Sequence, residues 1–461
     1  MQRHIKIMVF LEKIMRYMNA LLVLIYKYLK NERKEASKMK KNQCLRGIFS
    51  AALAISLFGT SLPVYAEEGG KEITYFYNTS TEAATEVVQE AIKRYEEKTG
   101  NTVKITMMEG ESYKTKIKTC VASNSLPDVF NYWTGEQFST LVSSGNVKDI
   151  TEMVTKDTEY KEQFIDGAFD EVTVDEKIYG IPSSVTGQVL YYNKQLFKDA
   201  GIEKVPSTFS ELEDACAKLK DAGITPIMVG SKDRWPLLGW FSYLAVRNGG
   251  TELYREVTDG ESEASFANPE FIKAGEQLNK LSQEYFVNGS LAIDSAMAPA
   301  QFAAGNAAMF IGGTWDISTL SSNEEMADNI SFAPFPSADD GKPEDSGTIY
   351  GGIANCIAIN ESSENADDAY ELIKEIISVE TETEMVKKTG SLSCMKVEVE
   401  KEDMPLLGYE ITEFFNNEVT GFFPYTDQAL QPEQAENLLN AMTEIIASED
   451  VNVEEQLSTI K

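Results

Sequence analysis

The chain has 461 residues, with 42 Lys or Arg against 73 Asp or Glu and a formal net charge of −31 at pH 7. A surface this acidic repels nucleic acid and anionic lipid, and neither is therefore expected as a partner. The only histidine is His4, which excludes histidine-based catalytic triads and histidine-ligated zinc from the rest of the chain. The length allows two domains, each with its own core.

The N-terminal region has the pattern of an export signal. A basic stretch at 40–46 precedes an apolar run, Ile48 to Gly59, and the small residues at 64–66 suit signal peptidase. We predict a signal peptide over 39–66 that is cleaved after Ala66, and hence an extracellular or cell-surface protein. An uncleaved signal anchor is the alternative.

Residues 1–38 are predicted to be a spurious upstream extension, because codons for residues 33–36 can contain a ribosome-binding sequence just before Met39. Residues 1–66 contain 12 Lys or Arg and 3 Asp or Glu, which leaves 30 and 70 in residues 67–461 and a net charge of about −40. Cys44 precedes the apolar run instead of following it, so a lipid anchor of the kind common in Gram-positive bacteria is not expected.

The first part of the exported chain alternates strands with helices. We predict strands at 73–77, 103–108 and 127–133 and helices at 79–98 and 111–122, the first helix starting with a Thr79–Glu82 capping box. A βαβαβ order indicates a parallel sheet, and ligands bind beyond the carboxyl ends of such strands. The candidate ligand-binding residues at or next to those ends are Asn78, Glu109, Trp133 and Glu136.

The second part is also α/β. In chain order we predict an extended segment at 180–193, helices at 194–200 and 208–222, a strand at 225–229, a loop at 231–240, a helix at 269–285, a strand at 307–311, an extended segment at 349–359, helices at 366–379 and 381–388, and further helices around a Gly/Pro break at 421–424. The cysteines at 120, 216, 356 and 394 lack CxxC spacing and are expected to be buried free thiols.

The stretch from Phe302 to Asp316 is the most informative. A turn leads into an apolar strand, and a Gly-Gly pair then delivers Trp315 and Asp316 to a helix start. Glycine permits tight turns and close approach. An indole ring stacks on the C–H face of a sugar, and a carboxylate accepts from its hydroxyls.

This stretch, FAAGNAAMFIGGTWD at 302–316, resembles the extracellular solute-binding proteins of family 1, which capture sugars for ABC importers. So do PDVF at 127–130, LYYNKQLFKDAGI at 190–202 and the VPSTFSELEDACAKLKDAGITPI that follows at 205–227. The resemblance covers essentially residues 70–461. It implies a two-lobed, periplasmic-binding-protein-like α/β fold, each lobe a mainly parallel sheet with flanking helices.

The resemblance also implies a hinge with chain crossings near 181–184, 348–353 and 390–394. Lobe one is then 67–182 with 352–390, and lobe two is 183–350 with 393–461. Partners implied are a carbohydrate, more readily an oligosaccharide than a monosaccharide, and the membrane permease subunits of an importer. The chain itself is expected to be a monomer, with no cofactor and no metal, and it contains no GxxxxGK[ST] motif.

The candidate stacking residues are Trp133, Trp235 and Trp315, of which Trp315 resembles the site tryptophan of the family, whereas Trp240 is predicted in the core. Each polar candidate also has an ordinary structural role. Asn78 and Asp316 either bind hydroxyls or cap helices, and Glu109 and Glu136 either bind or are simply solvated.

Ser184 and Thr186 lie in the first crossing and Gly352 in the second, so each either contacts ligand or only serves the hinge. By resemblance, Tyr425 and Asp427 supply a third contact from lobe two. Two alternatives remain open: a secreted glycoside hydrolase that uses two carboxylates, and a binding protein for a polyamine or peptide.

Overall fold

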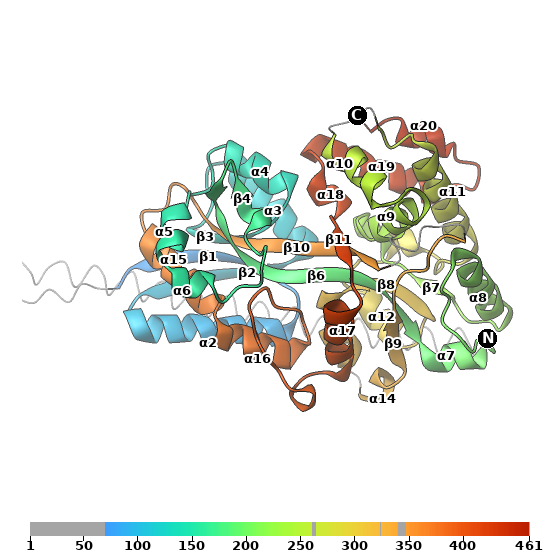
Figure 1. Ribbon diagram of the computed structural model, residues 1–461, viewed down its shortest axis with the longest axis horizontal. Helices are drawn as coiled ribbons and strands as arrows, with labels where there is room; N and C mark the ends of the chain where they lie inside the picture. The colour runs from blue at the N-terminus through green and yellow to red at the C-terminus, as the bar shows by residue number, and fades with distance from the viewer. Residues whose placement is uncertain (1–69, 261–263, 323, 340–346, 461) are drawn as a thin grey trace, which may run out of the picture. The chain divides into compact units, whose positions relative to one another are not determined.

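The computed structural model describes residues 70–461, apart from 261–263, 323, 340–346 and 461 (Figure 1). The predicted signal peptide, its cleavage site, Cys44 and the extension at 1–38 lie outside the described residues. Within the described part, no helix has both the length and the apolar character needed to cross a membrane.

The chain begins with the predicted βαβαβ unit. Its elements are β1 (Glu72–Thr79), α2 (Glu82–Thr99), β2 (Thr102–Glu109), α3 (Gly110–Ala122) and β3 (Val129–Trp133). Strand β1 pairs in parallel with both β2 and β3, which confirms the parallel order.

The expected capping box of α2 is wrong by two residues. Thr81 caps the helix, its hydroxyl accepting from the Ala84 amide at 3.2 Å, because Thr79 still belongs to β1, where it pairs with Glu109. The helix ends as predicted at Gly100, whose φ of 74° is the left-handed conformation that glycine adopts without strain.

Two long strands join the parallel units of the sheet. They are β6 (Gly180–Asn193) and β10 (Thr348–Ile359), which are antiparallel to each other. The strand order is β2-β1-β3-β10-β6-β8-β7, with β8 (Met309–Gly313) and β7 (Ile227–Met228) parallel. β9 (Ile330–Ala333) pairs with β6, and β11 (Gly421–Phe423) pairs with β10, so the break expected at 421–424 contains a strand. A separate hairpin pairs β4 (Thr173–Val174) with β5 (Lys177–Ile178).

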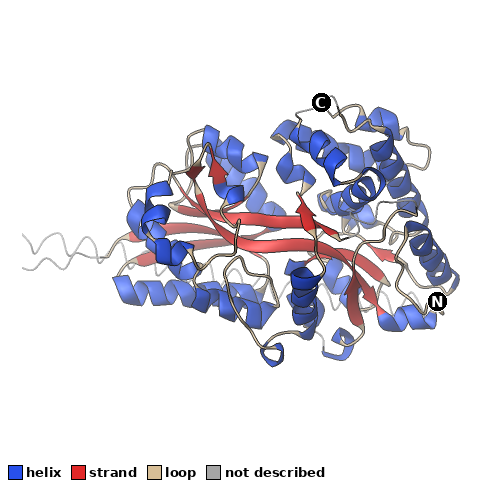
Figure 2. Ribbon diagram, viewed as in Figure 1, coloured by secondary structure: helices blue, strands red, loops and turns tan. Residues whose placement is uncertain are grey.

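Helices cover both faces of these strands (Figure 2). The remaining ones are α4 (Glu136–Ser143), α5 (Thr151–Lys156), α6 (Thr158–Lys161), α7 (Lys194–Asp199), α8 (Phe209–Asp221), α9 (Pro236–Gly249), α10 (Thr251–Asp259), α11 (Pro269–Glu284), α12 (Ala298–Ala303), α13 (Ile317–Ser321), α14 (Glu324–Ala327), α15 (Ala366–Ile376), α16 (Val379–Thr389), α17 (Leu406–Asn417), α18 (Thr426–Ala429), α19 (Pro432–Ala447) and α20 (Val453–Leu457).

The buried apolar side chains form separate clusters on either side of the middle of β6 and β10. One cluster contains residues from 73–181, 356–377 and 394–395. Two others contain residues from 189–354 and 407–460. We call the first group the N-side core and the other two the C-side core. Because β6 and β10 run through both, the chain segments at their centres link the two cores, and the segment between residues 395 and 407 links them a third time.

The cysteines of the described part are buried and free, at positions 120, 216, 356 and 394. Burial raises the thiol pKa of Cys216, Cys356 and Cys394 above its ordinary value. These thiols are held in the protonated, unreactive form at neutral pH. The prediction of buried free thiols is confirmed.

Candidate functional site

The Gly-Gly pair before Trp315 allows a packing that no other residue would permit. A β-carbon added at Gly313 would lie 2.4 Å from the Trp315 ring, and one at Gly312 would lie 2.7 Å from the Asp316 carboxylate. The backbone of β8 therefore runs directly beneath the indole. The Asp316 carboxylate accepts from the Gly313 amide at 3.0 Å and so caps the short turn (η4, Thr314–Asp316) that carries the tryptophan.

Three aromatic rings meet at this carboxyl end of β8. The Trp235 and Trp315 centroids are 6.1 Å apart with their planes at 64°, and Tyr425 lies 6.2 Å from Trp315. Both tryptophans are only partly buried. Two indoles at a steep angle form a corner that can hold the apolar face of a sugar ring. We call Trp235, Trp315 and Tyr425 the aromatic corner.

Each wall of the aromatic corner has its own support. Trp235 precedes α9, and its neighbour Arg234 has a φ of 66°, which is uncommon for a residue with a side chain. The Arg234 guanidinium donates to Glu436 at 2.6 Å and to Asn440 at 2.8 Å, which anchors this strained turn to α19. Strained backbone of this kind concentrates at functional sites.

Tyr425 is fixed by a buried hydroxyl network. Its hydroxyl and that of Thr186 are 3.0 Å apart, which brings together two predicted site residues 239 positions apart. The next residue, Thr426, is fully buried and shares hydrogen bonds with Ser242, Tyr254 and Tyr350 at 2.5, 2.7 and 3.0 Å. The network holds the start of α18 against α9 and α10.

Two carboxyl groups near the corner are desolvated. Burial raises the pKa of Asp316 from 3.8 to about 7, against the opposing hydrogen bond from Gly313. Burial also raises the pKa of Asp427, with the Lys114 ammonium acting in the opposite direction. A third carboxyl, Glu382, lies away from the corner; burial raises its pKa from 4.5 to about 7, although Ser393 donates to it at 2.7 Å.

These raised values predict a pH dependence of stability. The native state holds protons on Asp316 and Glu382 that the unfolded chain releases near pH 4, so the free energy of unfolding is expected to fall as the pH rises from about 4 to about 7. Each group contributes on the order of 3 kcal/mol to that fall. Urea unfolding at about pH 5 and about pH 8 measures it. Asp316→Asn should reduce the difference between the two pH values, whereas Asp450→Asn at an exposed position should not.

Of the candidates that precede β6 in the chain, three lie at or next to the ends of their strands as expected, and Glu136 begins α4. Trp133 ends β3, and its ring contacts Tyr113 and Tyr132 edge-on at 5.9 and 5.8 Å. The Lys114 ammonium lies 5.5 Å from the Trp133 centroid. Trp133 is thus partly buried between two rings, as Trp315 is, and has a cation beside it in addition.

Asn78 is the last residue but one of β1, and its amide oxygen is enclosed and without a hydrogen-bond partner. Glu109 ends β2 and is exposed. Glu136 begins α4 and accepts a hydrogen bond from Gln431, the exposed residue before α19. Of these three, Asn78 alone has an unused buried polar atom.

Helix α4 contacts α18 and the residue before α19. Gln137 donates to the backbone oxygen of Asp427 at 2.5 Å, and Thr140 donates to Gln431 at 3.4 Å. A β-carbon at Gly135 would lie 2.8 Å from the Gln428 carbonyl, so the backbones are close. These polar contacts bridge the two cores beside the aromatic corner.

The middle of β6 lies between the two groups of candidates. Ser184 accepts from the Asn355 amide at 3.2 Å, and Asn355 pairs with Trp133 across β10 and β3. Gly352, with φ 134°, pairs with Thr186. The sequence pointed to Ser184 and Thr186 but missed Gln188, which is 3 % exposed and has an enclosed amide oxygen with no hydrogen bond. Such an atom costs about 1–3 kcal/mol of stability.

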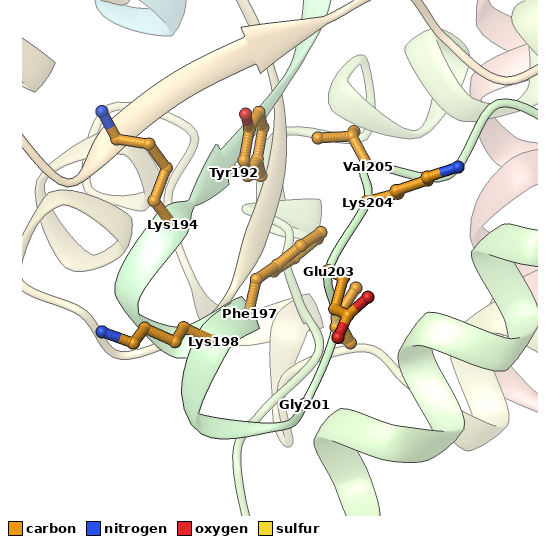
Figure 3. Close-up of a pocket in the computed structure, with 9 residues that line it drawn as sticks. Tyr192, Lys194, Phe197, Lys198, Gly201, Glu203, Lys204 and Val205 are labelled. Atoms are coloured by element: carbon orange, nitrogen blue, oxygen red, sulfur yellow. The ribbon is translucent and has the colours of Figure 1, made fainter.

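A surface hollow of about 530 Å³ lies elsewhere, at α7 and the segment after it. Tyr192, Phe197 and three lysines line it, and the ammonium groups of Lys194 and Lys198 point away from the two rings (Figure 3). It contains none of the predicted ligand-binding residues.

Comparison with known proteins places the chain among transport components. Residues 78–383 match the family model of the bacterial extracellular solute-binding proteins. The chain belongs to this family. Membership favours binding without catalysis, so the hydrolase interpretation loses its support, and it agrees with an extracellular location.

Individual members of the solute-binding family are distant relatives. A solved structure from work on xylan utilisation by the thermophilic bacterium Caldanaerobius polysaccharolyticus is 29 % identical, with a TM-score of 0.79, over 84 % of this chain and 98 % of that one. The diacetylchitobiose-binding protein DasA of Streptomyces coelicolor is 26 % identical over 65 % of this chain and 67 % of its own. An uncharacterised ABC transporter extracellular-binding protein of Pyrococcus horikoshii is 28 % identical, but this chain spans only 38 % of its length.

Proposed function

We propose that this solute-binding protein captures an oligosaccharide outside the cell and delivers it to an ABC-type importer. The observation that carries the proposal is the aromatic corner of Trp235, Trp315 and Tyr425 at the carboxyl end of β8. Two partly exposed indoles beside a buried tyrosine that is held by a hydroxyl network suit a ligand with both an apolar face and hydroxyl groups. The proposal extends to export by the predicted signal peptide and to permease subunits as the membrane partners.

Capture works by closure of two lobes on the ligand. The lobes of this proposal are 67–182 with 352–390 and 183–350 with 393–461, linked by the crossings in β6 and β10 and near residue 390. Ligand that touches both lobes stabilises the closed form through contacts that the open form cannot make. The hydrogen bonds between α4 and the start of α18 and α19 are contacts that opening would break.

The ligand class can be tested directly. We expect calorimetry to detect binding of at least one series among xylo-, malto-, chito-, galacto- and manno-oligosaccharides, with xylo-oligosaccharides the first to try because of the relative studied for xylan utilisation. Bound ligand should raise the melting temperature, since it binds the folded state alone. Neither heat nor a thermal shift with any series, while a polyamine or peptide binds, would refute the proposal.

A further inference from the structure

The side chains of β6 separate into two kinds on its two faces. Thr186 faces the Tyr425 hydroxyl, whereas a β-carbon at Gly187 would lie 2.6 Å from the Phe415 ring of α17. Figure 1 shows α17 and α18 on opposite sides of β6. Because side chains alternate along a strand, Ser184, Thr186 and Gln188 share the face toward α18. We call these three residues the β6 stripe.

The β6 stripe connects the two groups of candidate residues. At one end, Gln188 pairs with Gly313, two residues before Trp315, and its amide oxygen packs against Gly239 in the first turns of α9, the helix that Trp235 precedes. At the other end, Ser184 bonds to Asn355, which lies beside Trp133. Four residues of extended chain separate the ends by about 13 Å.

Gln188 is the polar group of the stripe that the fold leaves unused. Thr186 bonds to Tyr425 and Ser184 to Asn355, but the enclosed amide oxygen of Gln188 has no hydrogen-bond partner. The terminal torsion of glutamine is soft, so the amide can turn from Gly239 toward a ligand beside the tryptophans. The stripe contains hydroxyl and amide groups and no charge, which suits a neutral ligand.

We propose that a neutral oligosaccharide of at least two rings lies along the β6 stripe, with Gln188 hydrogen-bonding the ring at the aromatic corner and Ser184 contacting a ring farther along. This rests on the proposed function and adds to it an orientation, a minimum length and a specificity-determining residue. Gln188 hydrogen-bonds every ligand that binds, whereas Ser184 contacts only ligands long enough to reach it.

Gln188→Met separates binding from folding, because methionine fills a similar volume without hydrogen bonds. We expect it to raise the melting temperature, by removing an unpartnered polar atom, and to weaken binding of the best oligosaccharide series about ten-fold or more. Gln188→Ala should weaken binding equally while creating a cavity. The control is Gln195→Ala, an exposed glutamine on α7, which should bind normally.

Chain length tests the orientation. Calorimetry with the mono- to tetrasaccharide of one series should show that Gln188→Met weakens every member, and that Ser184→Ala weakens only the longer ones. If the wild type binds sugars and both Gln188 variants bind them with the same affinity, the inference is overturned and the proposed function remains intact. Equal loss at every length in Ser184→Ala would overturn the orientation. Absence of any sugar binding by the wild type would instead defeat the proposed function.

Discussion

Replacement of Trp315 by alanine is expected to weaken oligosaccharide binding by about 2–4 kcal/mol, which is about 30- to 1000-fold. Trp315 is the centre of the aromatic corner, within 6.2 Å of both Trp235 and Tyr425. Its loss removes one wall of the corner and the ring that β8 holds through Gly313. Titration calorimetry of the variant against the best-binding series measures the effect.

The same change should leave the fold nearly as stable as before. Trp315 packs at the margin of the C-side core and is only partly buried, so its removal should lower the free energy of unfolding by about 1 kcal/mol. A loss of several kcal/mol in urea unfolding, with affinity retained, would place Trp315 among the structural tryptophans and remove the main support for the proposed site.

Trp240→Ala is expected to have the opposite effect, a large loss of stability with little loss of sugar affinity. Trp240 is 1 % exposed in α9, with Phe286 and Phe335 at 5.6 and 5.8 Å between ring centroids. Truncation of so large a buried side chain leaves a cavity and should cost about 3–5 kcal/mol of unfolding free energy. Urea unfolding of the variant provides the measurement.

Molecules of Trp240→Ala that remain folded should still bind sugar at close to wild-type affinity, because the ring partners of Trp240, Phe286 and Phe335, do not belong to the aromatic corner. Calorimetry at low temperature, with the folded fraction determined independently, checks this. The two variants together form a crossed pair, one affecting binding and the other stability. A pair that behaves alike would mean that the distinction between site and core drawn from exposure is wrong.

The sequence predicted helices and strands correctly where their bounds depend on neighbouring residues. The bounds of β6 agree with the expected segment at 180–193, and α2 ends at its glycine. The cap of α2 was misplaced because Thr79 and Thr81 are both suitable caps, and the choice depends on how far β1 pairs with β2. The strand in 421–423 was missed because its partner lies more than 70 residues earlier, in β10.

The site was harder to predict than the fold. The Gly-Gly-Thr-Trp-Asp motif by itself indicated Trp315 as a site residue. Tyr425 was predicted only from the family resemblance, because its contact with Thr186 spans 239 residues. Gln188 stood in the polar alternation of β6, yet glutamines are mostly exposed, and only the packing reveals its enclosed oxygen. The Glu136–Gln431 contact between distant helices had no local signal at all.

The buried thiols give the protein a practical property. Because the cysteines of the described part are buried, the surface of this part offers no native thiol to a thiol-reactive dye. A pair of cysteines introduced at the exposed positions Met107 and Leu291, the first before β6 and the second between β6 and β10 in the chain, would therefore be the labelled sites there. A donor and an acceptor fluorophore on that pair would report the distance between the two proposed lobes, with and without sugar.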